Sequence, residues 1–479
     1  MTTADHPDAT TGSRPGTLGA LRASGYLPRS VKVEMRANLL RRLTDGVPLF
    51  EGIVGYDESV IPAVENALLA GQDIVFLGER GQAKSRLARQ LVTLLDAHVP
   101  IVAMSELNDD PLAPIGPEAV ARIAAEGDET PVAWLPRDRR YGEKLATPDI
   151  SIADLIGEVD PIKVAEGRYL ADASTIHFGL IPRTNRGIFT INELPDLAER
   201  IQVGLLDILE ERDVQVRGYT LRLPLDLLVV ASANPEDYTS RGRIITPLKD
   251  RLGSQIRTHY PRTLEDEMAI MRQERTRFAE DSGPLIAEPE YMLELVAEVT
   301  HLARSSPEIS QRSGVSVRVS VANLEVLLAA ALKRAVRLGE PSGAPRVSDL
   351  AALQSSTTGK IELESLGDDA PEERIVDRLL SRALSAVFAR RVDADQLADV
   401  VGAFEGGLVI ETGDAIPSHE YVGWVREMPG MGAAVARLGA GESPAELASA
   451  IEFLLEGLHL QRRLNKARAT SSGGGRYRA

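Results

Sequence analysis

Residues 78–85 have the sequence Gly-Glu-Arg-Gly-Gln-Ala-Lys-Ser, and this stretch decides the fold. A short apolar run, Asp73-Ile-Val-Phe-Leu77, precedes it, and a helical pattern with leucines on one face follows from Lys84 to Ala97. Strand, glycine-rich turn and helix, in that order, form the context in which the pattern Gly-x-x-x-x-Gly-Lys-Ser/Thr cradles phosphates. Ala83 stands where this pattern has its second glycine, and every other position fits.

The chemistry of this loop follows from its residue types. Glycines let backbone N–H groups wrap a β-phosphate, and the helix N-terminus adds a positive partial charge. Lys84 would reach the β- and γ-phosphates and Ser85 would ligate Mg²⁺. The small side chain of Ala83 tolerates a close phosphate if its φ is negative. A strand–helix turn with a chance Lys-Ser is the less favoured alternative. The predicted nucleotide-binding residues are Gly78, Glu79, Arg80, Gly81, Gln82, Ala83, Lys84 and Ser85.

Composition narrows the class of protein. The chain has 479 residues, 43% of them hydrophobic and 26% charged, as in soluble globular proteins. Its length suggests about three domains. A net charge of −16 argues against nucleic acid as a partner, and the absence of cysteine excludes disulfides and thiolate chemistry. No secretory signal and no apolar run of about 18 residues is found, so we expect a cytoplasmic protein without a membrane span.

A second buried strand, Ile188-Phe-Thr-Ile-Asn-Glu193, ends in polar residues. It occupies the place of a Walker B strand, where an Asp holds the Mg²⁺ shell and a following Glu polarises the attacking water. Asn192 replaces that Asp, so it would contribute to the metal site without a charge. Glu193 keeps the general-base role. The alternative is that Asn-Glu simply opens the loop before the next helix.

Three further residues are candidates for nucleotide chemistry. Asn234 follows the apolar strand 227–233, and the carboxyl end of a parallel strand faces the ligand crevice. An Asn-Pro turn is an equally good explanation of Asn234. Arg251 is a candidate arginine finger, delivered to a γ-phosphate from a neighbouring subunit, and a surface ion pair is its commoner alternative. Arg318 precedes a long helix and could reach the nucleotide in cis, or be a solvated helix-start arginine.

The order of elements predicts an α/β protein. Strands alternate with helices up to about residue 260, which favours a parallel sheet with flanking helices. Strand signals then fade and helical patterns dominate. We therefore predict a disordered tail (1–17), a nucleotide-binding α/β domain with a helical lead-in (18–260), a helical lid (261–358), a linker (359–371), a mostly helical C-terminal region (372–466) and a disordered tail (467–479). Residues 108–145 are expected to form loops and short helices, and 214–223 a hairpin.

Taken together, these motifs resemble the AAA+ ATPases of the magnesium chelatase I-subunit and MoxR group, over roughly residues 48–356. The matching segments are Phe50 to Gly55, Gly78 to Ser85, Gly187 to Leu194, Ala231 to Pro235 and Asp250-Arg251. The resemblance implies that Ile53 and Val54 contact adenine, that Asn234 is sensor 1, that Arg251 is the arginine finger and that Arg318 is the sensor 2 arginine. Partner-facing insertions would lie within 150–186 and 212–223. Asn192 departs from the family pattern.

The resemblance also implies a function and partners. We expect a hexameric ring that uses ATP and Mg²⁺ to remodel or activate a protein, with a partner that carries a von Willebrand A domain. Alternatives are the motor subunit of a true magnesium chelatase and, because of Asn192, an ATP-gated scaffold that does not hydrolyse. A transcriptional activator is less favoured, because no Gly-Ala-Phe-Thr-Gly-Ala loop and no convincing helix-turn-helix is found. The acidic charge disfavours a helicase or clamp loader.

Overall fold

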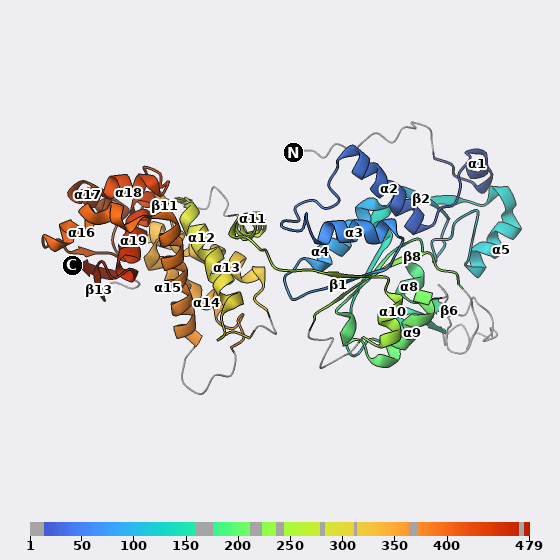
Figure 1. Cartoon of the computed structure of the whole chain (residues 1–479). Coiled ribbons are helices and arrows are strands. Elements are labelled where there is room, and N and C mark those ends of the chain that lie inside the picture. Colours follow the sequence, from blue (N-terminus) through green and yellow to red (C-terminus); the bar gives the residue numbers. More distant parts are fainter. Residues whose placement is uncertain are drawn as a thin grey trace. The chain divides into compact units, whose positions relative to one another are not determined.

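The computed structural model describes residues 14–159, 176–210, 223–235, 244–277, 283–310, 314–363, 372–468 and 474–479. The chain divides into two compact units, drawn in one colour scale from blue to red in Figure 1. The first unit comprises Met1–Glu79 and Ala83–His259, and the second comprises Arg80–Gln82 and Tyr260–Ala479. Each unit has hydrophobic core of its own.

A five-stranded sheet with the order β4-β7-β8-β1-β9 forms the centre of the first unit. Every neighbouring pair of these strands is parallel. The strands are β1 (Ile74–Leu77), β4 (Tyr141–Leu145), β7 (Gly187–Asn192), β8 (Leu227–Ala233) and β9 (Ser254–Arg257). All residues of β1, β7 and β8 are buried, as expected of parallel strands covered on both faces. The predicted α/β class is confirmed.

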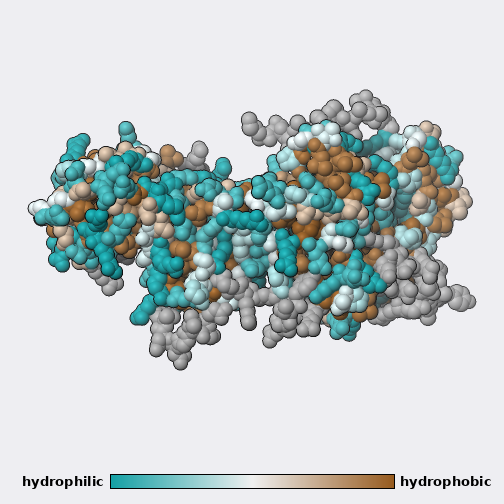
Figure 2. All heavy atoms as spheres, viewed as in Figure 1, coloured by the Kyte–Doolittle hydropathy of each residue, from teal (hydrophilic) through white to brown (hydrophobic). Residues whose placement is uncertain are grey.

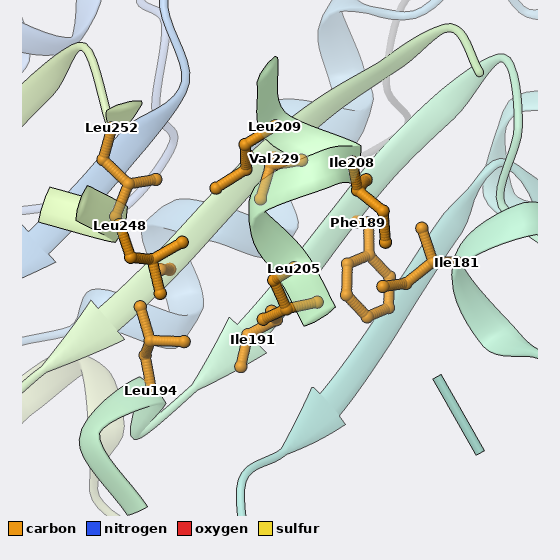
Figure 3. A pocket seen from close by; sticks show the side chains of 11 residues that line it. Ile181, Phe189, Ile191, Leu194, Leu205, Ile208, Leu209, Val229, Leu248 and Leu252 are labelled. Carbon is orange, nitrogen blue, oxygen red and sulfur yellow. The ribbon is translucent and has the colours of Figure 1, made fainter. Parts of the chain in front are cut away.

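Helices cover the two faces of this sheet and enclose two apolar cores. One core includes side chains of α2 (Val31–Asp45), α3 (Val60–Leu69) and α4 (Lys84–Gln90). The other includes α9 (Glu199–Glu210) and α10 (Thr246–Arg251). Figure 3 shows the second core, where Phe189 and Ile191 of β7 point towards Leu205 and Ile208 of α9. The pocket drawn there is lined by apolar side chains, so it offers nothing to a phosphate and belongs to the core.

Smaller elements complete the first unit. β2 (His98–Val102) pairs antiparallel with β3 (Val132–Pro136) in a separate two-stranded sheet. In the segment 150–186, β5 (Gly157–Val159) pairs antiparallel with β6 (Ile176–Phe178), and residues 160–175 lie outside the described residues. The hairpin predicted for 214–223 also lies outside them, except Leu223. The other helices that the structure describes in this unit are α1 (Leu18–Ala23), α5 (Pro117–Glu126), α6 (Ile152–Leu155) and α8 (Leu180–Arg183).

Two predictions for the first unit are wrong in part. Residues 108–145 were expected to form loops and short helices, and they do include α5, but they also contain β3 and the sheet strand β4. The sequence Tyr-Gly-Glu-Lys-Leu of β4 is polar, as is common for an edge strand, and among the described residues β4 is the end strand of its sheet. Residues 14–17 were expected to be disordered, but the Trp134 indole donates to the Pro15 carbonyl at 2.9 Å and Thr17 bridges Pro131.

The second unit is mainly helical and shares one hydrophobic core, which runs from Met268 to Tyr477. Its long helices α12, α13, α15 and α19 all contribute buried side chains. The helices are α11 (Leu264–Glu274), α12 (Glu290–Ser305), α13 (Val317–Leu338), α14 (Leu353–Thr357), α15 (Glu372–Arg391), α16 (Ala398–Glu405), α17 (Ser418–Glu427), α18 (Met431–Arg437) and α19 (Pro444–Leu460). The common core joins residues that the sequence assigned to separate lid and C-terminal regions.

Short strands close this unit. β10 (Leu285–Ile286) pairs parallel with β11 (Ser342–Gly343), while β12 (Ile410–Glu411), β14 (Gly475–Arg478) and β13 (Asn465–Arg468) form a three-stranded sheet. The prediction of a disordered tail over 467–479 is therefore wrong for 475–478. Tyr477 explains this, because its ring is buried in the core and its hydroxyl donates to Glu456.

On the face that Figure 2 shows, the surface is mostly hydrophilic, with apolar residues gathered in places. On α2 the apolar side chains of Val33, Leu40 and Leu43 are each more than two-fifths exposed. Within the described part of the chain, no helix combines the length and apolarity that crossing a membrane requires.

Candidate nucleotide and metal site

The glycine-rich loop connects β1 to α4 at the carboxyl end of the sheet. The Gly78 amide donates to the carbonyl of Ala233 at 3.1 Å, which ties the start of the loop to the end of β8. Ala83 is the N-cap of α4 and has φ +56°, in the left-handed region. This differs from the negative φ under which alanine was expected to be tolerated here. The loop therefore keeps the backbone that a glycine would adopt freely and forces alanine into it.

Lys84 is buried at the first position of α4. Its ammonium donates to the carbonyl of Gly78, to the carbonyl of Glu79 at 2.9 Å and to the Oδ1 atom of Asn234 at 2.9 Å. A buried cation needs such partners, because an isolated charge away from water is costly. Phosphate oxygens placed in the loop would offer the same ammonium charged acceptors instead of neutral carbonyls.

Glu193 and Asn234 lie at the ends of neighbouring strands. Glu193 follows β7 with φ +55°, and its amide donates to the Ser232 hydroxyl at 3.1 Å. The Nδ2 atom of Asn234 donates to Oε2 of Glu193 at 3.0 Å. Since ammonium groups only donate and carboxylates only accept, the two neighbours of Asn234 set the orientation of its amide. Lys84, Asn234 and Glu193 thus form one hydrogen-bonded chain.

Asn192 is the last residue of β7 and is buried. Its Oδ1 atom accepts hydrogen bonds from the hydroxyls of Ser85 and Ser232, each at 3.3 Å. Mg²⁺ takes oxygen ligands, so Ser85 Oγ and Asn192 Oδ1 fit the donor chemistry of a magnesium site beside the phosphate loop. Both donors are neutral, and the phosphates of a nucleotide would have to supply most of the negative charge.

A carboxylate that the sequence did not single out completes this cluster. Glu143 of β4 accepts a hydrogen bond from Nδ2 of Asn192 and two from Arg89, at 2.8 and 2.9 Å. Burial raises the pKa of the Glu143 carboxyl, but the hydrogen bonds from Arg89 and Asn192 outweigh burial and hold the pKa below its ordinary value. Glu143 is therefore a stable anion next to the proposed metal donors.

The other predicted residues lie in other elements of the chain. Ile53 and Val54 are half-buried in the loop before α3, and Ile53 packs against the core of that face. Arg251 is the last residue of α10, and its guanidinium donates to the Pro247 carbonyl at 3.0 Å. Arg318 is an exposed residue of α13 in the second unit, which also contains Arg80, Gly81 and Gln82. The nucleotide roles of all these residues stay predictions.

Comparisons with known proteins point to the same class. Residues 164–254 match the Sigma-54 interaction domain. The chain is 28% identical over 261 residues to the chloroplastic magnesium-chelatase subunit ChlI of Oryza sativa subsp. indica, covering 53% of this chain and 59% of that protein. It is 26% identical over 285 residues to subunit ChlI of Nostoc sp., covering 57% of this chain and 70% of that protein. The resemblance to AAA+ ATPases and magnesium chelatase I subunits is confirmed, although the chain spans less than two thirds of the rice protein.

A solved structure of the magnesium chelatase subunits BchI and BchD is similar at 19% identity, with a TM-score of 0.35, over 70% of this chain and 94% of that chain. This similarity is too low to support an inference about function.

Proposed function

We propose that the chain is an AAA+ motor that binds ATP with Mg²⁺, hydrolyses it and uses the cycle to remodel or activate a protein partner. The hydrogen-bonded chain from Lys84 through Asn234 to Glu193 is the observation that carries this proposal. It joins a phosphate-binding ammonium to a carboxylate through an amide that can respond to a γ-phosphate. A purely structural strand–helix turn has no need of such a chain.

Each side chain has a definite task in hydrolysis. Lys84 leaves the loop carbonyls and binds the β- and γ-phosphates, which stabilises the charge that develops during transfer. Its departure frees the amide oxygen of Asn234, so this residue can orient water as well as hold Glu193. Glu193 accepts a proton from the attacking water. Mg²⁺, with Ser85 and Asn192 as its protein donors, would neutralise phosphate charge.

The decisive experiment compares the native protein with Glu193→Gln. We expect both to bind ATP, and we expect the variant to hydrolyse it at least ~100-fold more slowly, as is typical when a general base is removed. Steady-state phosphate release and equilibrium ATP binding measure the two properties. The control is Glu199→Gln, an exposed residue in the first turn of α9, which should leave both unchanged. A native protein that does not bind ATP would contradict the proposal.

A second function is favoured by Asn192, whose amide brings no charge to the metal site. In this alternative the protein is an ATP-gated scaffold, in which nucleotide changes assembly without turnover. ATP binding by both native protein and Glu193→Gln, without hydrolysis by either at rising Mg²⁺, would select it. The motor subunit of a magnesium chelatase is the other alternative, and metal insertion after mixing with the remaining chelatase subunits tests it.

The assembly that we propose is a homo-hexameric ring. In it, Arg251 serves as the arginine finger for a neighbouring subunit, Arg318 binds nucleotide in cis, and Ile53 and Val54 contact adenine. The partner would carry a von Willebrand A domain. These assignments follow the resemblance to AAA+ proteins, and the position of Arg251 at the end of a short helix suits delivery to another molecule.

A further inference from the structure

We propose that Glu143 and Asn192 act as a pair that replaces the single carboxylate of a Walker B strand, with Glu143 as the positioning residue that strengthens Asn192 as a metal donor. The inference rests on the proposed nucleotide function. It concerns a side chain from a strand that the sequence did not predict, and it accounts for the Asn at a position where a charge is expected.

Strand register brings the pair together. β4 and β7 are parallel, with Glu143 opposite Thr190 and Leu145 opposite Asn192. Side chains of residues opposite one another lie on the same face, and residues two apart along a strand share a face. Glu143 and Asn192 therefore project from the same face of the sheet near its carboxyl end. α4, which carries Ser85 and Arg89, contributes to the core on that face.

The hydrogen bonds give the Asn192 amide a single orientation. Its Nδ2 group donates to the Glu143 carboxylate, which can only accept. Its Oδ1 atom is thereby turned towards Ser85, where it accepts from the hydroxyl at 3.3 Å. Without Glu143 the amide could rotate and present a donor to the metal site. The first effect of Glu143 is thus to keep an oxygen atom in place.

The second effect is electronic. A hydrogen bond to an anion polarises the donor, and chains of hydrogen bonds strengthen one another where the local dielectric is low. An amide that donates to a carboxylate carries more negative charge on its oxygen. Carboxylates that accept hydrogen bonds from metal-ligating histidines raise ligand basicity in the same way. Glu143 also adds a negative charge within two hydrogen bonds of Ser85.

Arg89 stabilises the position of the Glu143 carboxylate and limits its electrostatic effect. Its guanidinium is bidentate to Glu143, with hydrogen bonds at 2.8 and 2.9 Å, and its side chain is 63% exposed. The ion pair fixes the carboxylate and keeps it ionised, while the water around Arg89 screens part of the attraction. Glu143 therefore acts through Asn192 and not as a direct metal ligand.

The pair makes an unusual prediction for Asn192→Asp. If the site only lacked a charge, this substitution alone would improve metal binding. In the pair, however, it would place two carboxylates in contact, where like charges repel. We expect Asn192→Asp alone to bind metal no better than the native protein. Asn192→Asp combined with Glu143→Gln should restore a complementary pair, with the donor and acceptor exchanged.

Mn²⁺ is the probe, and its affinity for the protein–ADP complex is measured by electron paramagnetic resonance. We expect Glu143→Gln to weaken Mn²⁺ binding roughly 10-fold, as loss of an outer-shell partner does. The double variant should recover to within about 3-fold of the native affinity, a non-additive result for residues in contact. The control is Glu126→Gln, which removes the carboxylate of an exposed Arg–Glu pair in the same unit. It should bind Mn²⁺ like the native protein.

ADP affinity measured in EDTA distinguishes a failure of the proposed pair from a failure of the proposed nucleotide site. Unchanged ADP binding across all variants shows that the site is folded, so any difference in Mn²⁺ binding belongs to the pair. If native protein binds no ADP with or without metal, the proposed nucleotide function itself is wrong. If ADP binds, Glu143→Gln keeps native Mn²⁺ affinity and Asn192→Asp alone raises it, the pair is overturned while the nucleotide site stands.

Discussion

At the residue scale, the phosphate loop closes on a backbone that alanine adopts at a cost. Ala83 has φ +56° as the N-cap of α4. Left-handed backbone costs an L-residue with a Cβ atom roughly 1–2 kcal/mol, and glycine avoids this cost. The next residue is the buried Lys84, whose ammonium is held by the loop carbonyls. The strain therefore lies at the point where the loop must hold its shape for phosphate.

Ala83→Gly should stabilise the first unit slightly or leave it unchanged. Removing the Cβ atom relieves the strain, while the greater freedom of glycine in the unfolded chain offsets about 0.4–1 kcal/mol of the gain. The control is Ala88→Gly, in the buried interior of α4, which should lose about 1 kcal/mol or more. Urea unfolding followed by the fluorescence of Trp134, with Trp424 replaced by Phe, measures both. Equal losses in the two variants would refute the strain at Ala83.

The residues of the site differ in how far sequence could find them. Lys84, Asn192 and Glu193 occur in local motifs, and the structure brings their side chains into one cluster with Asn234. Glu143 has no local signal, because its partner Asn192 lies 49 positions away and meets it only through strand pairing. The positive φ of Ala83 is equally hidden, since the pattern that calls for glycine does not say how alanine will adapt.

At the element scale, α15 and α19 meet through a glycine. A Cβ atom on Gly457 would lie 1.9 Å from the Phe388 ring, which is fully buried. Gly457→Ala should therefore destabilise the second unit by about 1–3 kcal/mol, the usual cost of overpacking. Gly402→Ala is the control, because that glycine is exposed in α16 with nothing within 4 Å, and it should gain up to about 1 kcal/mol. Urea unfolding, followed by the fluorescence of Trp424 in a Trp134→Phe background, measures the stability of both variants. A gain in stability in both variants would refute the close contact.

Three helices of the second unit are joined by one buried carboxylate. Glu267 of α11 accepts hydrogen bonds from Arg304 of α12 at 2.7 and 3.1 Å and from Ser320 of α13. Glu267→Gln leaves a largely buried guanidinium without its anion, so we expect a loss of roughly 3 kcal/mol in the free energy of unfolding. Glu290→Gln removes a carboxylate of α12 that belongs to an exposed ion pair. This control should change the free energy of unfolding by less than about 0.5 kcal/mol.

The effect of Glu267→Gln should depend on pH. Burial raises the pKa of Glu267, but the nearby His301 and the hydrogen bonds from Arg304 and Ser320 outweigh burial and lower the pKa. A carboxyl whose pKa is lower in the folded state stabilises fully above its unfolded value, about 4.3, and less as pH falls through the folded value. The stability gap between native protein and Glu267→Gln should thus be constant above about pH 5 and narrow below it. A gap that widens with acid would contradict this linkage.

Secondary structure could be predicted where one hydrophobic period dominates the sequence. It could be predicted less well where tertiary contacts determine the structure. The C-terminal region expected to be mostly helical begins with α15 at Glu372. Its helical stretch over 418–437 is divided into α17 and α18, because Pro429 cannot donate a backbone hydrogen bond and Gly430 adopts φ +82°. Strand β4 escaped prediction because only its position in the sheet, and not an apolar pattern, makes it a strand.

At the scale of the whole molecule, the change from strands to helices near residue 260 marks the boundary between the two compact units. The composition of residues 372–466 gave no sign that they would share a core with α12 and α13. Tertiary packing creates the shared core through contacts such as that between Tyr291 and Phe453, whose ring centroids lie 4.8 Å apart. A pairing between residues so distant in the sequence leaves no local pattern, whereas the boundary leaves a clear one.

The assembly prediction is that the active site is shared between copies of the chain. If Arg251 reaches the nucleotide of a neighbour, Arg251→Ala should bind ATP but lose at least ~1000-fold in turnover, the usual contribution of an arginine finger. Glu193→Gln should be similarly inactive. Mixing the two inactive proteins should restore hydrolysis, because an Arg251→Ala subunit keeps Glu193 and can receive Arg251 from a Glu193→Gln neighbour. Phosphate release across mixing ratios should peak near equal amounts, where such neighbours are most frequent. An arginine that acts within its own chain predicts no recovery at any ratio, since no subunit then holds both groups.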